Sequence, residues 1–153
     1  MSSNKKVKNA SPTTADGIEF KSRLEANTYK RLKDEGFSPQ YERLYFDLID
    51  AFYPRSACYD KHYDRSLKDK VFGLNSVKVQ AITYTPDFTF MYKDRLIVIE
   101  CKGKPNDVFP IKKKLFRRWM DKYTHLTGVS ILYFEIHSLD ELEESIEVIR
   151  SLN

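Results

Sequence analysis

The sequence predicts an α/β fold with a mixed central sheet flanked by helices. Helical periodicity appears at 20–36, 108–123 and 138–151, and strand-like runs separate these segments. The run at 96–99 is continuously apolar, as in a strand that is buried on both faces. With 153 residues, of which 41% are hydrophobic and 14% aromatic, the chain can bury one core.

The first predicted element is a helix at 20–36, with Gly36 as its stop because glycine readily ends helices. Glu25 falls inside the apolar arc of this helix. A carboxylate on the core side of a helix needs a partner. Two interpretations remain open, a salt bridge to Lys21 or a place in a metal site with Asp87 and Glu100.

Downstream of this helix we expect a strand at 41–48, a long irregular region at 53–76 and a strand at 77–84. The irregular region mixes basic residues with tyrosines. It could contact DNA by charge and stacking, form a dimer arm, or be a passive excursion. Its basic and aromatic residues include Arg55, Tyr59, Lys61, His62, Tyr63, Arg65, Lys68 and Lys70.

A predicted hairpin, with strands at 86–92 and 96–101 and a turn at 93–95, carries the most informative polar residues. Because strand side chains alternate, Glu100 and Lys102 should point the same way. Charged groups at the end of a buried strand are costly unless they are paired or bind a metal. An ordinary Glu–Lys pair on a surface hairpin is the simpler alternative.

Asp87, at the start of the first strand of this hairpin, can supply a second carboxylate next to Glu100. Two carboxylates and a lysine at one edge of a sheet suit Mg²⁺-assisted hydrolysis of phosphodiesters, because hard oxygen ligands suit Mg²⁺. Cys101 alternates with Glu100 and should face the core.

The predicted helix at 108–123 has Asn106 or Asp107 as its cap and tolerates Pro110 in its first turn. One side is apolar and the other is basic. A short loop joins this helix to the Glu-x-Lys strand, so the basic side should lie near the acidic residues and contact phosphates. A solvated basic face is the alternative. The basic residues are Lys113, Lys114, Arg117 and Arg118.

The C-terminal part is predicted to form a strand at 129–135 and a helix at 138–151, which opens with Ser138 and Glu141 as a capping box. The segment 135–153 carries a net charge of −5. The rest of the chain therefore carries +9, since the whole chain carries +4. A basic body suits a polyanionic partner.

Three motifs occur in the order typical of the PD-(D/E)XK nuclease superfamily: Ser-Arg-Leu-Glu at 22–25, Tyr-Thr-Pro-Asp-Phe at 84–88 and Glu-Cys-Lys-Gly at 100–103. Over roughly 20–134 the chain most resembles the phage endonuclease I type of Holliday-junction resolvase. It is also similar to uncharacterised phage proteins with an Ala-Ile-Thr-Tyr strand and a Lys-Lys-Lys-Leu-Phe helix, here at 81–84 and 112–116. TnsA-like transposition endonucleases share much of the pattern.

The resemblance implies a restriction-endonuclease-like core and a role for each motif residue. Asp87, Glu100 and the carbonyl of Cys101 would hold Mg²⁺, for which Mn²⁺ can substitute. Glu25 would complete the acidic cluster. Lys102 would position or activate the attacking water and offset phosphate charge.

The same resemblance implies a homodimeric endonuclease that is selective for branched DNA, in the cytoplasm of a bacterial or phage-infected cell. Two alternatives stay open. One is an end-, nick- or transposition-associated nuclease of the TnsA-like type, and the other is a catalytically silent DNA-binding module.

The expected domain organisation is a flexible basic arm at 1–16 and one nuclease domain at 17–153, with an excursion at about 54–76. The arm contains Lys5, Lys6 and Lys8 and has no apolar segment typical of a secretory signal. No apolar run approaches the length that spans a membrane, so we expect no membrane partner.

Overall fold

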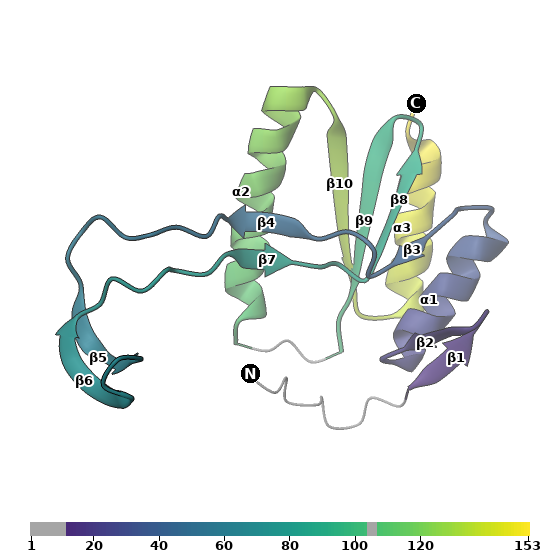
Figure 1. Cartoon of the computed structure of the whole chain (residues 1–153). Coiled ribbons are helices and arrows are strands. Elements are labelled where there is room, and N and C mark those ends of the chain that lie inside the picture. The colour runs from purple at the N-terminus through teal and green to yellow at the C-terminus, as the bar shows by residue number, and fades with distance from the viewer. Residues whose placement is uncertain (1–11, 104–106) are drawn as a thin grey trace. The chain divides into compact units, whose positions relative to one another are not determined.

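The computed structural model describes residues 12–103 and 107–153. In the unit formed by 12–46 and 84–153, helices lie on both sides of a sheet (Figure 1). In chain order, the elements are β1 (Thr13–Ala15), β2 (Ile18–Phe20), α1 (Arg23–Asp34), β3 (Gln40–Tyr41), β4 (Phe46–Ile49), β5 (Tyr59–Asp64), β6 (Asp69–Leu74), β7 (Ile82–Tyr84), β8 (Phe88–Tyr92), β9 (Arg95–Cys101), α2 (Phe109–Thr127), β10 (Ser130–Ile136) and α3 (Leu139–Ser151).

The central sheet has the strand order β10-β9-β8-β3. Strand β9 runs antiparallel to β8 and parallel to β10, so the sheet is mixed, as the sequence predicts. The hairpin turn between β8 and β9 is Lys93–Asp94 rather than 93–95. Both turn residues have positive φ (45° and 60°), as in the two-residue turns that match strand twist, and Arg95 already belongs to β9.

The sheet separates two layers of helices (Figure 1). On one face, alternate strand residues such as Phe88, Ile97 and Ile99 join residues of α1 and α3 in the main core. On the other face, Phe116 of α2 packs against Tyr133 of β10, with ring centroids 5.6 Å apart. The predicted mixed α/β architecture is confirmed.

Helix α1 begins at Arg23, three residues later than predicted, because Ser22 caps it and Phe20 belongs to β2. The predicted stop at Gly36 is confirmed. Gly36 has φ 81°, and its N–H donates to the Lys33 carbonyl at 2.9 Å. The N–H of Phe37 donates to the Leu32 carbonyl at 3.0 Å, which completes a Schellman cap.

The predicted strand at 41–48 is wrong in one respect, since it is two short strands in different sheets. β3 pairs with β8, whereas β4 pairs with β7. Between them Glu42 adopts a positive φ of 45°, which ends the first strand. Its N–H donates to the Asp87 carbonyl at 2.8 Å, so this break ties β3 to the start of β8.

The predicted irregular region is also wrong, because 59–74 forms the antiparallel hairpin β5–β6. The described chain divides into two compact units, one made of 12–46 with 84–153 and the other of 47–83. The second unit contains the β5–β6 hairpin and has no buried residue. The sequence did not predict this hairpin because aromatic and charged residues alternate along it and both of its faces are exposed to solvent. Such a pattern has no apolar face from which a strand could be recognised.

The chain ends differ from the predictions in detail. Thr13–Ala15 forms β1, so this part of the arm predicted at 1–16 is a strand, and the lysines of the predicted arm lie outside the described residues. Helix α2 runs to Thr127 and is capped by Val108 without a side-chain hydrogen bond; Asp107 is therefore not its cap, and Asn106 lies outside the described residues. The predicted Ser138 cap of α3 is confirmed, since its side chain accepts from the Glu141 N–H. Within the described ranges no helix is long and apolar enough to cross a membrane.

Candidate functional site

The β8–β9 pairing places Asp87 beside the end of β9. Phe88 pairs with Ile99, so the residue before Phe88 lies next to Glu100. Asp87 Oδ2 accepts a hydrogen bond from the Cys101 N–H at 2.7 Å. This bond fixes the carboxylate at the point where β9 leaves the sheet.

Both oxygens of the Glu100 carboxylate are bound by donors. The Tyr84 hydroxyl donates to Oε2 at 2.6 Å, and Lys102 Nζ lies 2.5 Å from Oε1. The predicted common direction of Glu100 and Lys102 is therefore confirmed. The Lys102 ammonium also lies 3.8 Å from the centroid of the Phe109 ring, where a cation–π contact holds it.

Glu25 is buried at the start of α1, as its place in the apolar arc predicts, and neutral donors surround its carboxylate. The Tyr41 hydroxyl donates to Oε2 at 2.6 Å and the Lys21 N–H donates to the same oxygen at 3.0 Å. The Ser22 hydroxyl donates to Oε1 at 2.9 Å. The salt bridge to Lys21 is wrong, because the Lys21 ammonium pairs with Glu42 instead.

The three carboxylates of Glu25, Asp87 and Glu100 form one electrostatic cluster, with exposed fractions of 7%, 9% and 5%. Burial raises the pKa of Asp87 well above its usual range, and the charges of Glu100 and Glu25 raise it further. The Cys101 N–H and the Lys102 charge oppose this rise only in part. An additional cation near Asp87 would therefore be favourable.

Two tyrosines complete the cluster as hydrogen-bond donors. Burial and then the charge of Glu100 raise the pKa of Tyr84, and burial followed by the hydrogen bond to Glu25 raises the pKa of Tyr41. Both hydroxyls therefore stay protonated at neutral pH. Cys101 is buried as predicted, and burial raises the pKa of its thiol, so it is not a thiolate.

The end of β9 offers oxygen atoms of the kind that bind Mg²⁺. Across 12–103 and 107–153, no group of three His, Cys, Asp or Glu side chains is arranged to hold a metal ion. The predicted set differs from such a group, since it has the two carboxylates of Asp87 and Glu100 and a backbone carbonyl at Cys101. Mg²⁺ is commonly bound through one or two carboxylates and keeps several waters, so the donor chemistry fits this ion.

The basic residues predicted on α2 do not form a uniform surface. Lys113 Nζ lies 2.5 Å from Glu135 Oε2, and Glu135 is the β10 partner of Glu100 across the sheet. Lys113 therefore lies near the acidic cluster but already has a carboxylate partner. The other three, Lys114, Arg117 and Arg118, are exposed.

A family model described as "Protein of unknown function (DUF1064)" matches residues 5–135. The chain belongs to the DUF1064 family. The match spans α1, the β8–β9 hairpin and β10 up to Glu135, and so contains every residue of the acidic cluster. No curated protein and no solved structure is measurably similar to the chain.

Within this DUF1064 chain, sequence reasoning named Glu25, Asp87, Glu100 and Lys102 but missed Tyr84 and Tyr41 as their donors. Tyr84 opens the Tyr-Thr-Pro-Asp-Phe motif and is 5% exposed. A buried tyrosine needs a partner for its hydroxyl, and its position three residues before Asp87 was the available signal.

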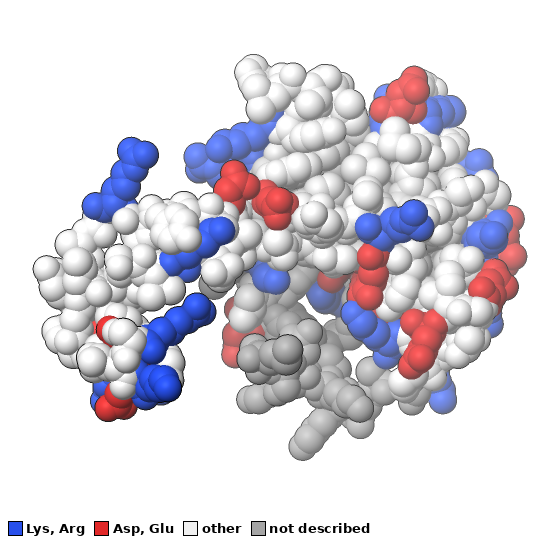
Figure 2. Space-filling model, in the orientation of Figure 1, with Lys and Arg blue, Asp and Glu red and all other residues white. Residues whose placement is uncertain are grey.

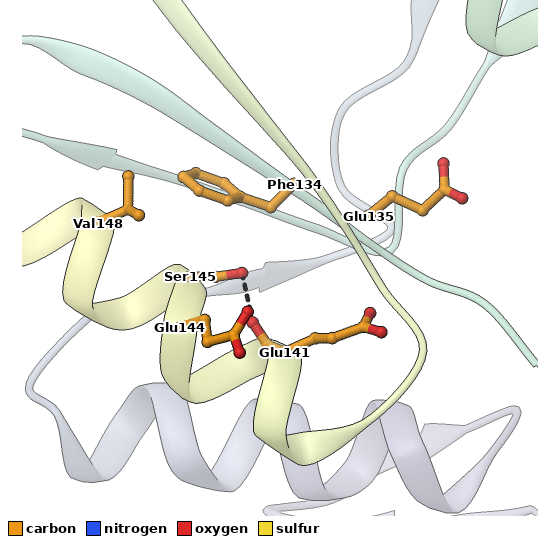
Figure 3. Close-up of a pocket in the computed structure, with 6 residues that line it drawn as sticks. All are labelled: Phe134, Glu135, Glu141, Glu144, Ser145 and Val148. Carbon is orange, nitrogen blue, oxygen red and sulfur yellow. Dashed lines mark hydrogen bonds between the residues drawn. The ribbon is translucent and has the colours of Figure 1, made fainter.

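A hollow lies between α3 and β10 (Figure 3). Three carboxylates line it, and the Ser145 hydroxyl is already bound to the Glu141 carbonyl at 2.7 Å. Acidic walls disfavour the binding of a polyanion in this hollow. Its lining residues are Phe134, Glu135, Glu141, Glu144, Ser145 and Val148.

Proposed function

We propose that the protein is a metal-dependent DNA endonuclease that hydrolyses phosphodiester bonds on a restriction-endonuclease-like core. The observation that carries the proposal is the buried cluster at the end of β9. There Asp87 and Glu100 lie side by side, burial and then the charge of Glu100 raise the pKa of Asp87, and Lys102 is the cation in contact with Glu100. Such a cluster is costly to fold and is typical of functional sites.

Each residue near the cluster has a role in this proposal. Asp87 and Glu100, with the Cys101 carbonyl, would hold Mg²⁺ or Mn²⁺, which stabilises charge on the phosphoryl oxygens and lowers the pKa of a bound water. The Tyr84 hydroxyl fixes the direction of the Glu100 carboxylate through its 2.6 Å hydrogen bond. Pre-positioned ligands require little rearrangement during the reaction.

In this proposal Lys102 acts on the substrate phosphate. Its ammonium is held between Glu100 Oε1 and the Phe109 ring, so its position is defined by two contacts. In the proposed reaction it orients the attacking water and offsets phosphate charge. Water adds to phosphorus as the bond between phosphorus and the 3′ oxygen breaks. The water oxygen stays on the 5′-phosphate, and a proton goes to the 3′ oxygen, which becomes the 3′-hydroxyl.

The preference for branched DNA and the homodimer rest on the resemblance to junction resolvases. Junction resolution needs two cuts, which a symmetric dimer supplies. The net charge of +9 outside 135–153 supports a polyanionic substrate, whether the DNA is branched or not.

The proposal is tested with purified protein, Mg²⁺ and a panel of supercoiled, linear, nicked and four-way-junction DNA. We expect cleavage by the wild type and none by Asp87→Asn or Glu100→Gln, while DNA binding persists. Asp94→Asn is the matched control, because Asp94 is a carboxylate on the exposed β8–β9 turn and asparagine tolerates its φ of 60°. Ca²⁺ should support binding without cleavage.

The catalytically silent DNA-binding module is the second candidate. It is favoured by the saturated state of Glu100, both of whose oxygens already have donors, and by the lack of a three-side-chain metal group among the described residues. Binding to the panel with no cleavage in Mg²⁺ or Mn²⁺ would support this candidate. Cleavage only in the presence of a partner protein would instead indicate the TnsA-like type.

A further inference from the structure

The β5–β6 hairpin separates its side chains into two chemically different faces. The cross-strand pairs are Tyr59–Leu74, Lys61–Phe72 and Tyr63–Lys70, which alternate with Asp60–Gly73, His62–Val71 and Asp64–Asp69. Because paired residues in a ladder share a face, every second pair points the same way. The register therefore assigns each of these side chains to one of two faces.

One face is aromatic and cationic and has no carboxylate; we call it the aromatic-cationic face. Its residues are exposed, with 64% of Tyr59, 56% of Tyr63 and 74% of Phe72 accessible to solvent. Figure 2 shows Lys and Arg side chains standing out on this unit. The face consists of Tyr59, Lys61, Tyr63, Lys70, Phe72 and Leu74.

The opposite face holds all three acidic residues of the two strands, which are Asp60, Asp64 and Asp69. Asp60 is engaged there, because its Oδ1 lies 3.1 Å from His62 Nδ1 and accepts from the Asn75 amide at 3.1 Å. The acids of the hairpin are thus kept away from the aromatic-cationic face. A polyanion approaching that face would meet lysines and no carboxylate from these strands.

The hairpin is also held in a defined shape by its turn. Asp64 Oδ1 accepts hydrogen bonds from the N–H groups of Ser66 at 2.7 Å and Leu67 at 3.1 Å. Lys68 adopts a positive φ of 53° and returns the chain to β6. The three rings are therefore presented on a pre-formed ribbon, which reduces the entropy cost of binding.

We propose that the aromatic-cationic face binds unpaired bases of single-stranded DNA. Every base has a π-face that stacks on an aromatic ring, while lysines between the rings contact the backbone phosphates. Bases in a duplex are already stacked on each other and cannot offer these faces. The inference rests on the proposed function for the identity of the polyanion, and it narrows the substrate to DNA with unpaired segments.

The test uses the full chain and a fluorescein-labelled 20-nucleotide oligo-dT, with a blunt 20-base-pair duplex as reference, both without divalent metal. We expect wild type to bind oligo-dT more tightly than the duplex. Tyr63→Ala with Phe72→Ala should weaken oligo-dT binding by at least about tenfold, since one base–aromatic stack contributes roughly 5- to 150-fold. Duplex binding should change less than about threefold.

The matched control is His62→Ala with Val71→Ala, a cross-strand pair on the opposite face of the same ladder. Its oligo-dT affinity should stay within about threefold of wild type. Equal losses in both double variants, or no loss in the first, would overturn the proposal. A wild type that is a dimer by light scattering, and a Tyr63→Ala, Phe72→Ala variant that is a monomer, would also overturn it, because the face would then be covered by a second copy.

The two proposals fail in different ways. Oligo-dT binding through this face with no cleavage of any DNA would leave the inference standing and refute the endonuclease. Cleavage that depends on Asp87, with oligo-dT binding insensitive to Tyr63 and Phe72, would do the reverse.

Discussion

Replacing Lys102 with Met should expose the electrostatic cost of the acidic cluster directly. Lys102 Nζ lies 2.5 Å from Glu100 Oε1, and the two side chains are only 18% and 6% exposed. Removing one partner of a buried ion pair costs about 3–5 kcal/mol. The partial exposure of Lys102 reduces this, so we expect a loss of about 2–4 kcal/mol in the free energy of unfolding.

The change is measured by urea unfolding without metal and with Mg²⁺. With a typical dependence on urea of about 2 kcal/mol per M, the midpoint should fall by roughly 1–2 M. Mg²⁺ at 100 times its dissociation constant should restore about 2.7 kcal/mol, because a cation bound by the native state stabilises it. Lys114→Met, at an exposed lysine of α2, should leave the midpoint unchanged.

Two results would refute this reasoning. One is a Lys102→Met protein as stable as wild type without metal, which would mean that the carboxylates do not repel one another as their burial indicates. The other is an equal response of wild type and Lys114→Met to Mg²⁺ with no response of Lys102→Met. A double variant with Glu100→Gln should recover most of the lost stability, because the unpaired charge is then gone.

Three other changes test the surrounding contacts. Tyr84→Phe should lower the cleavage rate and destabilise the protein by about 1–2 kcal/mol, since it leaves a buried oxygen of Glu100 without its donor; unchanged values in both assays would contradict the assigned contact. Glu25→Gln should reduce cleavage and weaken its dependence on Mg²⁺ concentration, whereas a lower melting temperature with normal cleavage would mean a purely structural role. The side-chain hydrogen bond from Arg31 lowers the pKa of Glu35, so this carboxylate stabilises the fold above its unfolded pKa near 4.5 and the benefit is lost as pH falls through the lower folded value. Acid titrations of unfolding for wild type and Glu35→Gln should therefore converge below pH 4.5, and parallel curves would show that the ion pair adds nothing.

Strand alternation was sufficient to predict part of the candidate site. Because residues two apart on a strand share a side, Glu100 and Lys102 had to point the same way, and their ion pair confirms it. Glu25 was likewise placed on the buried side of α1 by helical periodicity alone. The hydrogen-bond partners of Glu25 were not predictable in the same way. Tyr41 lies on another element and contacts Glu25 only in the folded chain, and the Lys21 ammonium pairs with Glu42 instead.

The β5–β6 hairpin could not be predicted by the same reasoning. Sequence periodicity reports burial, and this unit has no buried residue, so no face stands out as apolar. Its sequence signals were local and weak, namely Asp64 and Ser66, which form the turn. The break at Glu42 was hidden for a related reason, because its hydrogen bond to the Asp87 carbonyl joins residues far apart in the chain.

The pairing of β4 with β7 has a consequence for the evolution of DUF1064 proteins. The chain departs from the core along β4 and returns along β7, and these two strands are hydrogen-bonded to each other. Lengthening a closed loop is cheap, at about 0.6 kcal/mol for each doubling. Whole segments can therefore be exchanged between these strands while Asp87 stays just before β8 and Glu100 stays on β9. In the proposed enzyme, the choice of substrate can then diverge while the chemistry stays the same.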